Sequence, residues 1–278
     1  MLQHYFRDFL SSPCLFTKEV PFDFALFDFS PLPATYPPPT ATTLVIPPNE
    51  VLGKRVEQLF EYYISCHPHY TLIAKNIQVF RQKITIGELD FLLLDTHTDT
   101  VLHVELVYKF YIYDTTVRHS HPLANWIGPN RKDALLEKTE KLLQKQLPLL
   151  YKEETRNHFI SLGIDPSMIR QQVCYFAQLF PPLSAPSYSS PYIHPDAIQG
   201  HWISYPTFLS AAYHHASYYI PSKKDWICQP TAQTPWYSYQ IAKELIQAQI
   251  DQQKAPMVWI KRPNTPPAKL FIVWWLPH

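Results

Sequence analysis

Residues 87–114 decide the fold, and they read GELDFLLLDTHTDTVLHVELVYKFYIYD. Two apolar runs, 89–94 and 101–113, flank a polar turn at 96–99, which is typical of two strands joined by a short connection. The second run is apolar on both faces, as in a central strand of a covered sheet. Each predicted strand carries one carboxylate within its apolar run, Asp90 in the first and Glu105 in the second.

The flanking sequence predicts alternating helices and strands. A helix is expected to start near Asn49 as N-cap and to end at His67-Pro68, because Leu52, Val56, Leu59 and Phe60 recur at helical spacing. A further helix is expected over 132–147 with Asn130 as its N-cap, and another over 239–253. Strands are predicted over 72–81, 172–180, 257–261 and 270–275, the last two as a closing hairpin.

Three segments follow from these patterns. Residues 1–49 form an N-terminal extension. Its first part, 1–29, is expected to be ordered and aromatic, and its proline-rich stretch, 30–48, is expected to be extended and either to wrap over the surface or to act as a link. Residues 50–150 form the core. Residues 151–278 form a C-terminal elaboration packed on it, because their low charge and many aromatic residues suit packing. The predicted class is α/β (α+β), with a mixed sheet flanked by helices.

Composition excludes several function classes. The 278 residues include 28 Pro but only 5 Gly, and no two glycines lie within 30 residues of each other, so phosphate-cradling glycine loops and nucleophile elbows are absent. The formal net charge of +1 means that a nucleic-acid protein would have to concentrate its basic residues locally. The four Cys form no C-x-x-C pair, and no apolar run is long enough to span a membrane. We therefore expect a cytoplasmic protein without a membrane partner.

Asp90 and Glu105 together predict a site for a divalent metal ion. A buried carboxylate is costly unless it is paired, hydrogen-bonded or bound to a cation, and Mg²⁺ prefers one or two carboxylates together with water. An alternative stays open from the residues alone. Asp90 would then accept a hydrogen bond from a backbone amide, and Glu105 would pair with His103 or Lys109.

The order of motifs resembles a known superfamily. A helix that carries Glu57, then GELDFLLLD, then HVELVYKFYIYD, is similar to the PD-(D/E)XK nucleases. With WIGPN (126–130) and a helix ending in QKQL (144–147), the chain resembles most closely a bacterial domain-of-unknown-function family, number 1853, over residues 50–150. The resemblance implies a restriction-endonuclease-like core and a Mg²⁺- or Mn²⁺-dependent phosphodiesterase that cleaves DNA or RNA.

The resemblance also implies roles for single residues. Asp90 and Glu105 would be catalytic metal ligands, Glu57 would complete the metal site, and Lys109 would be the lysine of the motif. The spacing departs from the usual pattern, because Val107 occupies the position two residues after Glu105 and the lysine comes four residues after it. Lys109 lies on the same strand face but about 13 Å along it, at 3.3 Å per residue.

Weaker predictions concern substrate contacts. Gln144 or Gln146 would match the polar residue of the following helix, and Lys138, Trp126 and Asn130 are candidate contacts to nucleic acid. Acidic residues are interleaved with the basic ones over 131–145, which favours a solvated helix face. The Val at the usual lysine position motivates an alternative, a catalytically inactive nuclease-fold module that binds nucleic acid or a protein. A purely structural interaction protein is the third alternative, and the oligomeric state is left open.

Overall fold

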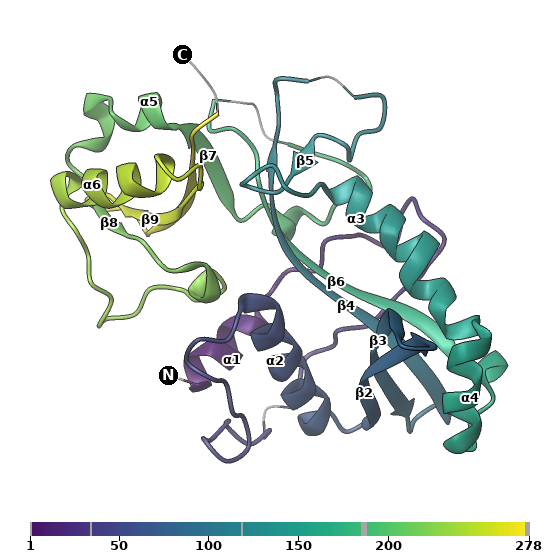
Figure 1. Cartoon of the computed structure of the whole chain (residues 1–278). Coiled ribbons are helices and arrows are strands. Elements are labelled where there is room, and N and C mark those ends of the chain that lie inside the picture. Colours follow the sequence, from purple (N-terminus) through teal and green to yellow (C-terminus); the bar gives the residue numbers. More distant parts are fainter. Residues whose placement is uncertain (1, 34, 118, 185–187, 276–278) are drawn as a thin grey trace. The chain divides into compact units, whose positions relative to one another are not determined.

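The computed structural model describes residues 2–33, 35–117, 119–184 and 188–275 and has a mixed α/β fold with two mixed sheets (Figure 1). The helices are α1 (Leu2–Leu10), α2 (Leu52–Cys66), α3 (Leu135–Lys141), α4 (Glu153–Ser161), α5 (Tyr205–Phe208) and α6 (Tyr239–Ile250). The strands are β1 (Ala25–Leu26), β2 (Tyr70–Arg81), β3 (Ile84–Asp95), β4 (Thr100–Tyr113), β5 (Trp126–Ile127), β6 (Arg170–Phe180), β7 (Gly200–Ser204), β8 (Ser217–Tyr219), β9 (Met257–Lys261) and β10 (Ala268–Val273).

The chain separates into two compact units, and each unit is built from two stretches of sequence. Unit 1 comprises Met1–Tyr108 and Lys138–Phe176, and unit 2 comprises Lys109–Glu137 and Ala177–His278. Residues 50–150, which the sequence assigned to one core, therefore contribute to both units.

Unit 1 contains most of the larger sheet, whose strand order is β1-β6-β4-β3-β2. The strands β2, β3 and β4 are antiparallel neighbours, as the two apolar runs and their turn predicted, and β4 lies at the centre of the order. Successive side chains of β3 cover opposite faces. Phe91 packs edge-on against Phe60 of α2, with ring centroids 4.9 Å apart, whereas Leu92 joins a cluster with Leu149 and Phe159.

Gly87, which begins the GELD motif, lies within β3 and is closely covered by a neighbouring side chain. A Cβ atom at Gly87 would lie 2.6 Å from the Cδ2 atom of Leu149, which belongs to the 3₁₀ turn Leu147–Tyr151. A side chain at position 87 would therefore require the buried Leu149 side chain to shift.

The N-terminal extension packs into unit 1. Phe9 contacts Phe176 of β6 at 5.6 Å between ring centroids, and Phe29 contacts Tyr63 of α2 at 4.3 Å. The proline-rich stretch lies along α2, because the Tyr62 hydroxyl donates to the Pro37 carbonyl at 2.9 Å and the Arg55 guanidinium donates to the Pro48 carbonyl at 2.7 Å. These contacts hold two carbonyls of the stretch against α2.

Unit 2 holds a four-stranded sheet of order β7-β10-β9-β8. The predicted closing hairpin is confirmed, since β9 and β10 pair antiparallel, while β7 joins β10 in parallel. Several aromatic residues of 205–219 are buried in the core of this unit, including Phe208, Tyr213 and Tyr218, with helix α6 packed beside them.

Two helix predictions are wrong at their starts. Helix α2 begins at Leu52 with Val51 as N-cap, not at Asn49, and no side chain caps it; Glu50 Oε1 accepts instead from the amide of Val51. The helix predicted over 132–147 consists of α3, a π-helical turn (Leu142–Gln146) and the following 3₁₀ turn. Asn130 is not its N-cap, because Asn130 Oδ1 accepts from the Ala255 amide at 2.9 Å.

Candidate functional site

The two motif carboxylates lie where β3 and β4 stop pairing. The antiparallel ladder runs from Asp95–Thr100 to Phe91–Val104, and Asp90 and Glu105 are the next residues along each strand. Beyond the last backbone pair, a side chain joins the two strands, because Asp90 Oδ2 accepts from the backbone amide of Leu106 at 2.9 Å. No described residue donates to the other oxygen of Asp90, and the side chain is partly exposed.

Glu105 is fully buried and held by two donors. Its Oε1 lies 3.0 Å from His103 Nε2, and its Oε2 accepts from Gln146 Nε2 at 2.6 Å. The amide oxygen of Gln146 accepts in turn from the Lys138 ammonium at 2.7 Å. The contacts that the structural alternative predicted, Asp90 to a backbone amide and Glu105 to His103, are thus both present.

The tautomer of His103 follows from its neighbours. Gln171 Nε2 lies 2.7 Å from the Leu147 carbonyl, which can only accept, so this end of the amide is the donor. The same nitrogen lies 2.9 Å from His103 Nδ1, which therefore accepts. The proton of the imidazole is then on Nε2 and is donated to Glu105, which fixes the orientation of a buried carboxylate.

A π-helical turn brings Gln146 to this network. The wide turn Leu142–Gln146 follows α3 directly and ends at Gln146, and such turns often occur at functional sites. Gln144, two residues earlier, is exposed. Of the two glutamines that the sequence proposed, the structure therefore places Gln146 on Glu105.

Asp90 has an unusual pKa. Burial, followed by the negative charge of Glu105, raises the pKa of Asp90 to about 8, and the charge of Glu57 adds to this. The hydrogen bond from Leu106 and the positive charge of Lys138 act in the opposite direction. The charge of Glu105 thus opposes the ionisation of Asp90.

The charge of Glu57 acts on the pKa of Asp90. Glu57 also pairs with a lysine that the sequence patterns did not single out. Lys54 donates to Glu57 Oε2 at 2.7 Å and lies 3.7 Å from Glu88 Oε1. Burial lowers the pKa of Lys54, but the hydrogen bond with Glu57 and the charges of Glu57, Glu88 and Asp90 outweigh this effect and raise it. Lys54 therefore stays positively charged beside the carboxylates. Its position three residues before Glu57 is the signal that could have found it.

Lys109, the lysine that the resemblance assigned to the motif, has another partner. Its ammonium lies 2.6 Å from Asp133 Oδ2, and Val107 before it is buried. Trp126 is also fully buried, with its indole N–H donated to the Tyr188 hydroxyl at 3.3 Å. Lys109, Trp126 and Asn130 all belong to unit 2, and each of these three contacts holds one segment of the chain against another.

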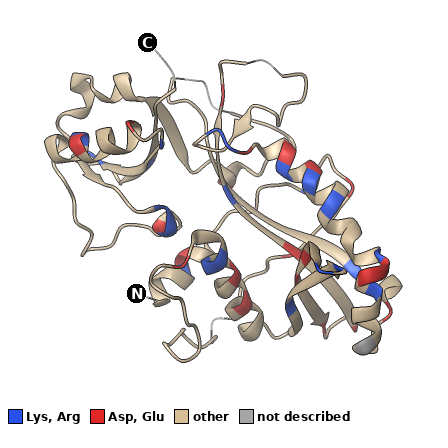
Figure 2. Ribbon diagram, viewed as in Figure 1, with Lys and Arg blue, Asp and Glu red and all other residues tan. Residues whose placement is uncertain are grey.

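Charges alternate along the helices near the site. In Figure 2, Lys and Arg (blue) and Asp and Glu (red) are interleaved along α2 and along α3. Alternating signs are typical of a solvated helix face. Lys138 of α3 is joined to the Glu105 network, through Gln146.

The carboxylates of the site form a small donor set for a metal ion. Across the described ranges, no three His, Cys, Asp or Glu side chains are grouped closely enough to hold a metal by themselves. Two carboxylates remain, Asp90 and Glu105, and Mg²⁺ commonly takes one or two carboxylates and completes its shell with water and substrate oxygens. Asp90 and Glu105 have the ligand chemistry that such an ion takes. Glu57 is not grouped closely enough with them to act as a third protein ligand.

One finding bears on membranes. Within the residues that the structure describes, no helix has the length and apolar character needed to cross a bilayer.

A comparison with protein families finds one match. A family model described as a domain of unknown function (DUF1853) matches residues 33–271 of the chain. The match confirms the family expected from the motifs at 87–95 and 103–114. No curated protein and no solved structure matches the chain.

Proposed function

The chain belongs to the DUF1853 family, whose description names no activity, and we propose that it is a metal-dependent phosphodiesterase that cleaves nucleic acid. The proposal rests on one observation. Asp90 and Glu105 end the same strand pairing, and the charge of Glu105 is a main cause, after burial, of the raised pKa of Asp90. A divalent cation between such groups relieves their repulsion.

Asp90 and Glu105 would hold Mg²⁺ or Mn²⁺. When bound, the ion supplies a water nucleophile at neutral pH and neutralises negative charge that develops on a phosphate. The residues of the chain prepare the site for it. His103 and Gln146 hold Glu105 in one orientation, and Asp90 keeps one oxygen without a donor among the described residues.

Two lysines supply positive charge at the site. Lys54 on α2 stands beside Glu57 and Glu88, and Lys138 on α3 is joined to Glu105 through Gln146. A cation near the scissile phosphate stabilises the negative charge that develops there in the transition state. We assign the lysine function of the PD-(D/E)XK motif to Lys54, because the charge of Asp90 acts on Lys54, whereas Lys109 pairs with Asp133.

The same proposal includes the restriction-endonuclease-like core. The chain order of helix α2, the three antiparallel strands β2–β4, helix α3 and strand β6 supports it, because this order carries the motif residues in the expected sequence. DNA or RNA is the proposed substrate, because the resemblance to the PD-(D/E)XK nucleases implies phosphodiester hydrolysis.

A second candidate is a nuclease fold that binds nucleic acid without cleaving it. The observation that favours it is the ion pair of Lys109 with Asp133, together with Val107 at the usual lysine position. The same site would then bind the cation and the nucleic acid without hydrolysis.

The test is a cleavage assay of the full chain on single- and double-stranded DNA and RNA with Mg²⁺ or Mn²⁺. Asp90→Asn removes one ligand charge and keeps the shape. Asp99→Asn is the matched control, because Asp99 is exposed and has a φ of 50°, a conformation that Asn tolerates well. We expect metal-dependent cleavage that is lost in Asp90→Asn and kept in Asp99→Asn.

Calorimetric titration with Mn²⁺ separates the two candidates. Mn²⁺ binding that Asp90→Asn abolishes, without cleavage of any substrate, supports the inactive module. Equal Mn²⁺ binding in the wild type and in Asp90→Asn contradicts both.

A further inference from the structure

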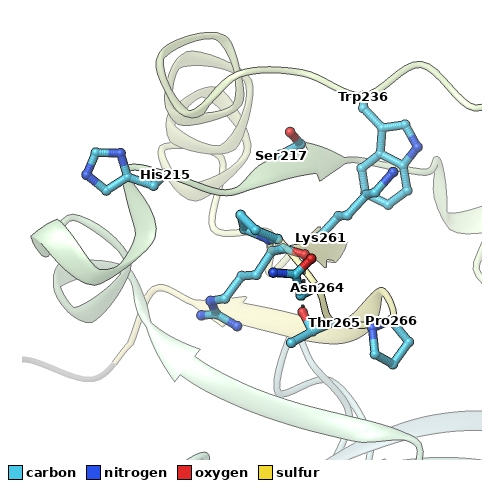
Figure 3. Close-up of a pocket in the computed structure, with 9 residues that line it drawn as sticks. His215, Ser217, Trp236, Lys261, Asn264, Thr265 and Pro266 are labelled. Atoms are coloured by element: carbon cyan, nitrogen blue, oxygen red, sulfur yellow. Dashed lines mark hydrogen bonds between the residues drawn. The ribbon is translucent and has the colours of Figure 1, made fainter.

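A cavity lies in unit 2, on the hairpin between β9 and β10. Its volume is about 570 Å³, and its walls come from the hairpin segment 261–266, from His215 and Ser217 at the start of β8, and from Trp236. Figure 3 shows the Lys261 side chain extended toward the Trp236 ring, with His215 at the other side of the pocket. A volume of this size accommodates a small organic ligand.

The pocket is electropositive. Among the described residues, no Asp or Glu lines the pocket, whereas Lys261 and Arg262 line it, and both of these side chains are exposed. Neither forms an ion pair with a carboxylate in the described ranges. The wider sequence agrees, because residues 252–278 contain no acidic residue, and residues 177–278 hold seven Lys and Arg against four Asp and Glu. The pocket therefore favours an anion.

The pocket also offers an aromatic surface. The Lys261 ammonium lies 5.5 Å from the ring centroid of Trp236, and the Arg262 guanidinium lies 5.5 Å from that of Tyr213. Trp236 is only partly buried. An indole face beside a cation suits a base stacked on the ring with its phosphate on the cation. The hydroxyls of Ser217 and Thr265 and the amide of Asn264 add hydrogen-bonding groups to the walls.

The sequence of the hairpin restricts its backbone before any ligand binds. It contains three prolines, Pro263, Pro266 and Pro267, and each ring restricts the backbone. Asn264 adopts a φ of 57°, and the Thr265 amide donates to the Arg262 carbonyl at 3.4 Å. A loop that is ordered in advance loses little conformational entropy on binding, which favours a specific ligand.

We propose that this pocket binds a nucleotide, with its phosphate on Lys261 and Arg262 and its base on Trp236. The ligand is a free nucleotide or a nucleotide of a single strand, since both present the same phosphate and base. A bare anion would leave the indole unused, and an apolar ligand would leave two cations without a partner. The inference goes beyond the proposed metal site and does not depend on it, because every residue that it uses belongs to unit 2.

The test measures binding to the full chain in EDTA, so that metal-dependent cleavage cannot contribute. The probes are AMP, inorganic phosphate and a fluorescent single-stranded 12-mer. The variants are Lys261→Gln with Arg262→Gln, and Trp236→Leu. The matched control is Lys243→Gln with Lys254→Gln, which removes the same charge from the same unit at positions outside the pocket.

We expect AMP or the 12-mer to bind, and both pocket variants to weaken that binding at least tenfold, while the control changes it less than twofold. Loss of two phosphate contacts should also reduce the salt slope of 12-mer binding by about 1.4. Binding of AMP identifies a free nucleotide as the ligand, and binding of the 12-mer alone identifies a strand. Thermal unfolding of each variant checks that it folds.

Three results would overturn the inference. These are no binding of AMP or 12-mer at millimolar concentration, binding that the Lys261/Arg262 variant leaves unchanged, and phosphate binding as strong as that of AMP with no effect of Trp236→Leu. Asp90→Asn should bind both probes like the wild type. A failed cleavage assay with intact binding in this pocket would therefore refute the proposed nuclease and not the pocket.

Discussion

Replacing Asp90 by Asn removes a titratable group whose folded-state pKa is about 8 and keeps an oxygen that can accept the Leu106 amide. The pKa of Asp in an unfolded chain is about 4. Since burial and Glu105 raise the pKa in the folded state, the contribution of Asp90 to stability is fully present below about pH 4. It is lost as the pH rises through about 8.

The size of the effect follows from one proton. Between these two pKa values the unfolded chain has released the proton of Asp90 and the folded chain retains it. The free energy of unfolding of the wild type should then fall relative to Asp90→Asn by about 1.4 kcal/mol per pH unit. From pH 5.5 to pH 7.5 the difference grows by about 2.5 kcal/mol, and it levels off above pH 8.

Urea unfolding in EDTA at pH 5.5, 6.5, 7.5 and 8.5 measures this difference. Asp99→Asn should follow the wild type at each pH, because Asp99 is exposed. Added Mn²⁺ should stabilise the wild type at pH 8.5 and leave Asp90→Asn unchanged. A difference that does not vary with pH, or that grows toward acid, would refute the reasoning about this carboxylate pair.

Three further predictions concern single side chains. Gly200→Ala should destabilise the protein by about 2–3 kcal/mol in urea unfolding, because a Cβ would lie 2.4 Å from the Lys269 carbonyl. The pKa of His67 is lowered, chiefly by burial, and its Nδ1 accepts a backbone amide. Wild-type stability should therefore fall as the pH drops below about 6.5, and His67→Gln should fall less. Lys54→Met should reduce cleavage about 100-fold, whereas Lys109→Met should retain it; the opposite ranking in the nuclease assay would return the lysine function to Lys109.

Local patterns in the sequence predicted several strands and one helix end. Strands β2, β3, β4 and β6 and the hairpin of β9 and β10 were found because their side chains alternate or form short apolar runs bounded by turn residues. The end of α2 was found because Pro68 restricts the residue before it. The start of α2 was not predicted correctly, because Asn49 is a favourable N-cap residue but the N-cap is Val51. The helix over 132–147 was predicted as regular, and its π-helical turn has no local signature.

The sequence by itself determined that Asp90 and Glu105 stand on neighbouring strands, because a short turn joins two apolar runs that must pair. The sequence also offered the contact between Glu105 and His103 as one alternative, because residues two apart on a strand share one face. Only the tertiary structure decided which side chains surround these carboxylates. Lys54 belongs to α2, Gln146 to a π-helical turn and Gln171 to β6. Lys109 instead forms an ion pair with Asp133. Sequence spacing carries information along one element, whereas such contacts depend on how separate elements pack.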